Sequence, residues 1–187
     1  LAYSTVSQLS YIVLGAAMAT GWSIIGGGLH IVMHAFGKIT LFFCAGAINV
    51  ALHKTEISDM RGIGRQMPFT MFAFLIGTIS VIGLPPFGGA WSKWYLMLGA
   101  LQAEQIVFVV VLMISSLLNI AYLLPIPIRA FFPGPAAQAA GADVVEHEGR
   151  HEAPFLCVAP LMFTAVGCLV LFFYAGPIVR LLAPIVP

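Results

Sequence analysis

Apolar residues dominate this chain in long runs, and short polar stretches separate the runs from one another. A transmembrane helix needs about 20 mostly apolar residues, and most of these runs reach or approach that length. Two of the runs are shorter and flank a stretch rich in proline and glycine. The pattern predicts membrane-embedded helices at residues 2–19, 24–51, 69–84, 90–103, 106–131 and 155–182.

The two short runs are best explained as one discontinuous span, broken from Leu84 to Gly89. At about 1.5 Å per residue, neither run alone crosses a hydrocarbon core of about 30 Å. The prolines in the break remove amide donors and its glycines permit irregular backbone, which is tolerated at membrane depth where it is buried or lines a water-filled cavity. The predicted fold is therefore all-α, a polytopic transmembrane helical bundle of about five spans.

The polar stretches predict how the bundle lies in the membrane. Residues 53–66 form a loop whose basic residues, Lys54, Arg61 and Arg65, mark the cytoplasmic side. If the broken segment crosses once, the second polar stretch, 133–154, is a flexible loop on the same side and the C-terminus lies outside. A full hairpin turn at the break would reverse the second half of this topology.

Composition agrees with a multi-pass protein of the cell (inner) membrane. The chain is 60% hydrophobic and 8% charged, and its mean hydropathy is +1.01. It lacks the Lys/Arg cluster that binding to nucleic acid requires, and its three cysteines lie in apolar runs without metal-ligand spacing, as packing residues do. Because the chain enters a helical pattern directly at Leu1 and does not begin with methionine, we expect residues 1–187 to form a single transmembrane domain, the C-terminal part of a longer protein.

Candidate chemistry is concentrated in the second run, where His30, His34 and Lys38 are spaced by four residues. This spacing stacks the three side chains along one face of a helix. Lys38 lies near the middle of the run, so its stem cannot easily carry the amine to either interface. A lysine at that depth costs about 3 kcal/mol on insertion scales, which favours a functional role.

Lys93 follows the break closely and completes a candidate proton relay. A lysine withdrawn from water can exchange protons near neutral pH, and histidine does so ordinarily. We expect protons to pass through His30, His34 and Lys38 and then across to Lys93, with repulsion between the two amines as a driving device. Two structural alternatives stay open: each histidine could simply be packed and hydrogen-bonded, and Lys93 could extend toward an interface.

Other sites receive less support from the sequence. Glu104 is most simply an interfacial residue at the end of a span. The acidic stretch from Glu146 to Glu152 resembles a solvated charge run more than a metal site. His30 and His34 could also bind a metal or haem, although two ligands on one helix face suit axial haem coordination badly. We predict neither a metal nor a cofactor, and a purely structural membrane subunit would leave Lys38 unexplained.

Four motifs in order resemble the C-terminal half of the proton-conducting antiporter-like subunits. This family covers the large membrane subunits of respiratory complex I and the A and D subunits of Mrp-type multisubunit Na+/H+ antiporters. The resemblance covers about the first 130 residues. The motifs are LAYSTVSQ from Leu1, HIVMHAFGKITLF from His30, MRGIG from Met60 and GLPPFGGAWSK from Gly83.

The resemblance implies two inverted repeats, each with a broken helix, and a lysine and histidine chain at mid-membrane. It assigns His30, His34 and Lys38 to the central axis and Lys93 to the broken helix, where some relatives carry glutamate. The chain corresponds to the second repeat and a final helix, so it should not transport anything alone.

Within the family, residues 91–95 and 118–125 look most like the D-type subunits of Mrp antiporters, and a complex I subunit stays open as the alternative. The implied partners are other membrane subunits and the lipid bilayer. The implied cargo is protons, with passage of Na+ left open. The matched region holds no quinone, flavin or iron-sulfur site, so any NADH:quinone chemistry would belong to partner subunits.

Overall fold

The computed structural model describes residues 1–132 and 151–185, and every regular element within these ranges is a helix. The prediction of an all-α bundle is therefore confirmed. The helices are α1 (Ala2–Met18), α2 (Gly21–Leu52), η1 (Ile57–Met60), α3 (Ile63–Gln66), α4 (Pro68–Ile82), α5 (Gly89–Gln102), α6 (Ile106–Leu123), α7 (Pro125–Phe131), α9 (Phe155–Phe173), α10 (Ala175–Leu182) and η2 (Ala183–Ile185).

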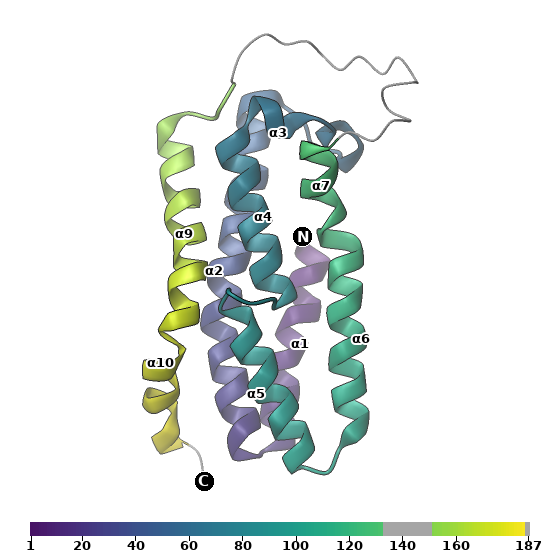
Figure 1. The fold of residues 1–187 in the computed structure, drawn as a ribbon, viewed down its shortest axis with the longest axis vertical. Coiled ribbons are helices and arrows are strands. Elements are labelled where there is room, and N and C mark those ends of the chain that lie inside the picture. The colour runs from purple at the N-terminus through teal and green to yellow at the C-terminus, as the bar shows by residue number, and fades with distance from the viewer. Residues whose placement is uncertain (133–150, 186–187) are drawn as a thin grey trace.

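The helices stand side by side as antiparallel columns (Figure 1). In chain order the columns are α1, α2, α4 with α5, α6 with α7, and α9 with α10. They correspond to the five spans expected from the sequence. Within the described ranges, three stretches are by themselves long and apolar enough to cross a membrane: Gly21–Leu52, Ile106–Phe131 and Phe155–Phe173.

Helix α2 is the central element, because it packs against α1, α4, α5 and α9. Half of the residues in the apolar part of α2 are buried inside the bundle, whereas the buried shares are 17% for the span Ile106–Phe131 and 22% for Phe155–Phe173. The helix begins at a capping box, in which Thr20 and Ser23 each accept a hydrogen bond from the other's backbone amide. Small residues let α5 approach closely: a Cβ atom on Gly26 would lie 2.6 Å from the backbone nitrogen of Leu96.

The break between α4 and α5 is confirmed at the predicted place. Helix α4 ends at Ile82 and α5 begins at Gly89. Gly83 caps α4, and its φ of 88° lies in the left-handed region that favours glycine. The chain continues past the break in the same general direction, so α4 and α5 form one column (Figure 1). The hairpin alternative is therefore wrong. Gly89 is required by packing, because a Cβ atom there would overlap the carbonyl oxygen of Ser80.

Helix α9 braces this interrupted column at two points. The amide of Gly88, in the break, donates a hydrogen bond to the carbonyl oxygen of Cys168 at 3.2 Å. Three residues further on, the indole Nε1 of Trp91 donates to the carbonyl oxygen of Phe172 at 3.0 Å. The backbone at the break is thus held by a neighbouring helix, as irregular backbone at membrane depth requires.

Glu152, expected in a solvated charge run, instead caps the start of α4. Its carboxylate accepts hydrogen bonds from the amides of Phe69 and Thr70, at 2.7 and 3.3 Å, and from the hydroxyl of Thr70 at 2.8 Å. The first amides of a helix have no partner within it and carry partial positive charge, so they attract a carboxylate. That part of the expectation is wrong, because a capping contact made 82 residues away in sequence is set by tertiary packing. The acidic residues before position 151 lie outside the described residues.

The Glu152 cap leads to a stability prediction. Changing Glu152 to alanine should lower the free energy of unfolding by about 1 kcal/mol, the usual cost of losing a helix cap. Unfolding of the purified subunit in detergent, followed by circular dichroism, measures the change. Glu56→Ala removes an exposed carboxylate at the same end of the bundle and should have little effect. Equal losses in the two variants would contradict the capping role.

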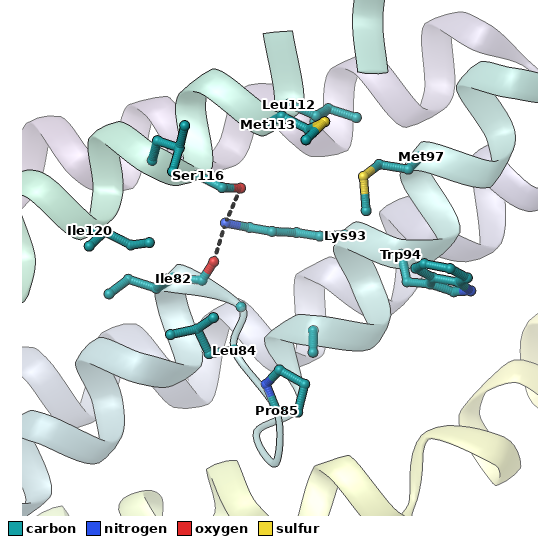
Figure 2. Close-up of a pocket in the computed structure, with 13 residues that line it drawn as sticks. Ile82, Leu84, Pro85, Lys93, Trp94, Met97, Leu112, Met113, Ser116 and Ile120 are labelled. Carbon is teal, nitrogen blue, oxygen red and sulfur yellow. Dashed lines mark hydrogen bonds between the residues drawn. The ribbon is translucent and has the colours of Figure 1, made fainter. Parts of the chain in front are cut away.

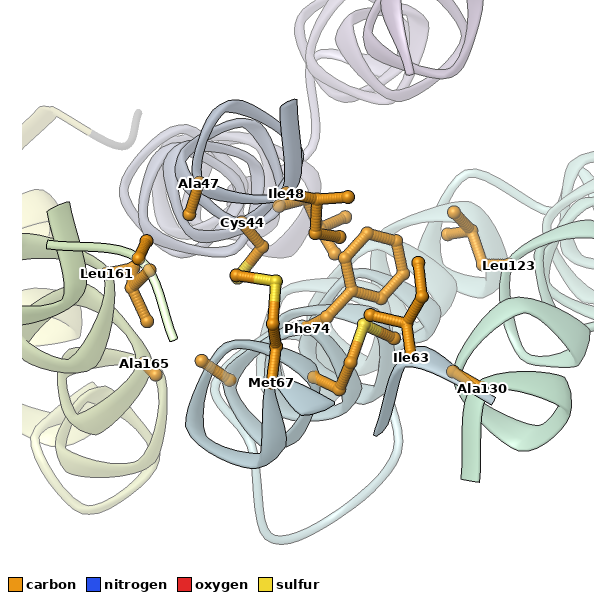
Figure 3. Packing of buried hydrophobic residues seen from close by; sticks show 14 of the residues in the cluster. Cys44, Ala47, Ile48, Ile63, Met67, Phe74, Leu123, Ala130, Leu161 and Ala165 are labelled. Atoms are coloured by element: carbon orange, nitrogen blue, oxygen red, sulfur yellow. The ribbon is translucent and has the colours of Figure 1, made fainter. Parts of the chain in front are cut away.

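The largest hydrophobic cluster joins α2, α4 and α9 at the end of the bundle that carries the Lys54 loop (Figure 3). Cys44 and Ile48 of α2 lie there against Met67, Phe74 and Leu161, and all five side chains are buried. Cys44 is thus a packing residue, as the sequence indicated. The cluster fixes α4 against α2, and so sets which face of the broken column meets the histidines.

Candidate functional site

The structure places His30, His34 and Lys38 on one buried face of α2. Their exposed fractions are 3%, 8% and 4%. The imidazole rings of His30 and His34 are stacked, with centroids 5.6 Å apart and planes inclined by 14°. The four-residue spacing therefore places the three side chains on one face of α2, as the helical period predicts. That face packs against other helices, so an amine and two imidazoles are buried.

Lys93 is also buried, with an exposed fraction of 6%. Its Nζ donates hydrogen bonds to the carbonyl oxygen of Ile82 at 2.7 Å and to the hydroxyl of Ser116 at 3.1 Å (Figure 2). Ile82 is the last residue of α4, so its carbonyl points out of the negative end of a helix whose continuation is broken. The break thus supplies the acceptor that holds the amine. Gly83 makes room for it, because a Cβ atom there would lie 2.8 Å from Cδ of Lys93.

Two side chains connect the histidines to Lys93. The hydroxyl of Ser92 lies 3.0 Å from Nδ1 of His30 and donates to the carbonyl oxygen of Gly89, so the imidazole Nδ1–H is the donor in the first contact. The ring of Tyr11 meets the His30 ring edge-on, with centroids 5.2 Å apart. Its centroid also lies 5.4 Å from Nζ of Lys93, within reach of a cation–π contact.

The order of the groups differs from the expected one. The structure brings His30 next to Lys93, whereas Lys38 lies eight residues further along α2, about 12 Å away at 1.5 Å per residue. The sequence led us to expect a step from Lys38 directly to Lys93. Packing instead arranges the groups as Lys38, His34, His30 and Lys93.

The observed partner of Lys38 is a backbone oxygen at the start of α1. Its Nζ donates to the carbonyl oxygen of Leu1 at 3.4 Å. The neighbouring residue, Gly37, lets α4 approach, since a Cβ atom there would lie 3.0 Å from Val81 and 3.5 Å from the hydroxyl of Ser80. In the described part of the chain, both amines donate hydrogen bonds to carbonyl and hydroxyl oxygens. Because these oxygens are uncharged, water can replace an amine as their donor at small cost.

Several buried polar atoms near this face lack a protein partner within residues 1–132 and 151–185. Leaving such a group without a hydrogen bond costs about 1–3 kcal/mol, and ordered water is the usual partner where protein offers none. These atoms therefore favour a hydrated interior beside α2. They are Nε2 of His30, Nε2 of His34, both amide atoms of Gln8, Oγ1 of Thr78 and Oγ of Ser80.

Polar residues of α1 and α6 complete the site, and none of them was among the residues predicted to carry protons. The hydroxyl of Tyr11 donates to Ser115 at 2.5 Å, and the hydroxyls of Ser4 and Tyr122 lie 2.6 Å apart. Asn119 accepts a hydrogen bond from the Tyr122 hydroxyl. The sequence does contain a signal for these residues, because they and Ser116 are polar positions in otherwise apolar runs. In a membrane helix such positions usually face other helices.

The geometry argues against the haem alternative. Axial ligands must approach the iron from opposite faces of the porphyrin, whereas the rings of His30 and His34 stack on each other along one helix. The residues that the structure describes contain no group of three His, Cys, Asp or Glu side chains that could hold a metal ion. Glu104, expected at a span end, lies in the turn between α5 and α6.

The fold defines a class, the polytopic helical membrane proteins, and buried amines beside an interrupted helix are typical of those members that handle ions. The family follows from comparison with known proteins. Residues 1–119 match the family model described as "NADH:quinone oxidoreductase/Mrp antiporter, TM". The chain belongs to this family, and the resemblance drawn from its motifs is confirmed.

Similar proteins come from both branches of the family. The N subunit of the NADH-quinone oxidoreductase of Desulforudis audaxviator is 41% identical over 91% of this chain, and the D subunit of the Na(+)/H(+) antiporter of Alkalihalophilus pseudofirmus is 33% identical over 71% of it. The chain spans 35% and 27% of the lengths of these relatives. A chain in the structure of the Mrp complex from Dietzia sp. DQ12-45-1b has the same fold, with a TM-score of 0.83 at 23% identity, covering 96% of this chain and 40% of that one.

Proposed function

We propose that this chain carries protons through the membrane as part of an antiporter-like subunit of a multisubunit cation/H+ antiporter, similar to the D-type subunits of Mrp complexes. The observation that carries the proposal is the burial of Lys38 and Lys93 in the interior of the bundle, with His34 and His30 between them. Burial of an amine is costly, and neither amine has a structural ion-pair partner among its observed contacts.

Protons would move along the row in the order that packing provides. Neutral imidazole accepts a proton at one nitrogen and releases one from the other, which suits His34 and His30 to the steps between the two amines. The stacked rings are too far apart for a direct hydrogen bond, so each step needs water, and the unpartnered Nε2 atoms are available to it. Ser92 and Tyr11 then bring His30 within reach of Lys93.

Electrostatic repulsion couples the two ends of the row. Two ammonium groups in a medium of low dielectric constant repel each other strongly, so a proton arriving at Lys38 lowers the affinity of the row for the proton at Lys93. Water in the interior of the bundle would then take up the released proton. Whether Na+ follows another route in the same complex is independent of this step.

Charge distribution supports the cell membrane as the location and the Lys54 end as the cytoplasmic end. Lys54, Arg61, Arg65 and Arg129 lie at that end of the bundle, and Arg180 lies at the other (Figure 1). Basic residues accumulate on the cytoplasmic side of membrane proteins. Other membrane subunits would be the partners, as the names of the relatives indicate for those proteins.

A second candidate is a proton-pumping membrane subunit of NADH-quinone oxidoreductase, and a specific observation favours it. The match to the N subunit of that enzyme has higher identity and covers more of this chain than the match to the D subunit of the antiporter. In that case partner subunits would carry out the redox chemistry. The lysine and histidine row would have the same role in both complexes.

One experiment separates the two candidates. Inverted membrane vesicles are prepared from cells that express the complete subunit with its neighbouring subunits, and internal pH is followed with a fluorescent amine. An Mrp-type complex is expected to release a respiration-generated proton gradient when Na+ is added. A complex I subunit is expected to support acidification by NADH that stops with a quinone-site inhibitor and does not respond to Na+. Vesicles that show neither response, despite an assembled complex, would exclude both candidates.

A further inference from the structure

A cavity of about 420 Å³ opens beside Lys93, between the break and α6. Its wall includes Leu84 and Pro85 of the break, Trp94 of α5, and Ser116 and Leu117 of α6, while the Lys93 amine lies across its inner side (Figure 2). Small-molecule sites have volumes of about 300–1,000 Å³ and mostly apolar walls with a few polar groups. This cavity has that size and that composition.

The mouth of the cavity faces the outer surface of the bundle. Leu84, Trp94 and Leu117 are 42%, 54% and 64% exposed, and the neighbouring residues along α6 are exposed and apolar as well. At membrane depth such a surface is covered by hydrocarbon or by another apolar protein surface. The side chains that line the cavity are almost all apolar, so it suits a molecule with an apolar body.

The inner end of the cavity has a basic group, Lys93, which has no acidic partner among residues 1–132 and 151–185. An ammonium group has three donors, and Lys93 uses two of them, toward Ile82 and Ser116. Its third position has no hydrogen-bonding protein partner in the part of the chain that the structure describes. The cavity is therefore complementary to a molecule with one acidic group at the end of an apolar chain.

We propose that the cavity binds a long-chain monocarboxylic acid, with the carboxyl group at Lys93 and the alkyl chain toward the mouth. The acid enters the bilayer uncharged. Its O–H bond breaks at the site, the proton bonds to the free electron pair of the amine, and the carboxylate and the ammonium group remain in contact. Mass and charge balance without a further reactant. Such a pair is a charge-assisted hydrogen bond in a medium of low dielectric constant.

Occupancy would stop proton transfer, because the bound carboxylate holds the proton on Lys93. This consequence rests on the proposed function, whereas binding itself does not. Bound acid would also lie against Trp94, which provides a direct signal. Binding and transport can therefore be measured separately.

The test uses the complete subunit, in its complex, reconstituted in nanodiscs. A long-chain fatty acid brominated on its alkyl chain should quench the fluorescence of Trp94, defined as the signal lost in a Trp94→Phe complex. The brominated alcohol and alkylamine of equal length should quench weakly. Lys93→Met should weaken binding of the acid about tenfold, to the level of the alcohol, because the charge-assisted contact is lost.

A matched pair of variants tests the position of the alkyl chain. Ala90→Phe fills the cavity and should abolish quenching by the acid, whereas Ala121→Phe adds the same group to the exposed surface of α6 and should leave it unchanged. Equal quenching by acid and alcohol, or quenching that survives Ala90→Phe, would overturn the proposal, as would absence of quenching. Specific quenching in a complex that moves no protons would retain the site and remove only its inhibitory role.

Discussion

Changing Lys38 to methionine is expected to reduce proton translocation by the complete complex to the background rate of empty vesicles. Methionine has a similar length and no titratable group, so the bundle keeps its packing and loses the proton-accepting amine at one end of the row. The measurement is the initial rate of internal acidification, normalised to the amount of assembled complex in the membrane. We expect assembly to be unchanged, because Lys38 makes no ion pair among its observed contacts.

Lys38→Arg distinguishes a relay from a fixed positive charge. Arginine keeps the charge but does not release its proton in proteins, so a relay should fail in this variant almost as completely as with methionine. A purely structural charge would be restored by arginine. Lys54→Met, in the polar loop, is the matched control and should translocate normally. Full activity of Lys38→Met would contradict the proposed function.

The second large effect is expected for Lys93→Met, which should also stop proton movement in an assembled complex. The variant removes both hydrogen bonds of the amine and leaves the Ile82 carbonyl oxygen and the Ser116 hydroxyl without their shared donor. The same acidification assay measures the loss. Ser116→Ala removes one of the two contacts and keeps the amine at Ile82, so it should reduce the rate by only a few-fold.

Measuring both the rate per complex and the amount of assembled complex in Lys93→Met distinguishes a relay from a structural role. If Lys93 only stabilised the break, Lys93→Met would lower the amount of assembled complex and leave the rate per complex unchanged. A relay loses rate per complex at normal abundance. Equal rates per complex in Lys93→Met and the wild type would rule out its participation.

Much of the fold could be predicted because its determinants are local. Run lengths set the spans, and the prolines and glycines from Leu84 to Gly89 set the break. The row of His30, His34 and Lys38 was equally accessible, since helical period alone places them on one face. In each case the relevant residues are neighbours in sequence.

The sequence could not predict which of these side chains lies next to Lys93, because that arrangement depends on tertiary packing. Helical spacing places His30, His34 and Lys38 in a row but does not determine which end of the row contacts α5. Close packing of α2 against α5, as at Gly26 and Leu96, brings His30 to Ser92. The Glu152 cap and the Tyr11 contact with Ser115 are likewise formed by residues about a hundred positions apart. The sequence shows the polar groups involved but not their pairing.

The hydrogen bonds from Gly88 and Trp91 to α9 have a mechanical consequence. Lys93 is two residues from Trp91, so a sideways displacement of α9 would pull on the same helical turn that carries the amine. We therefore expect that a protein bound to the outer side of α9 would displace Lys93, although that protein would contact neither the lysines nor the histidines.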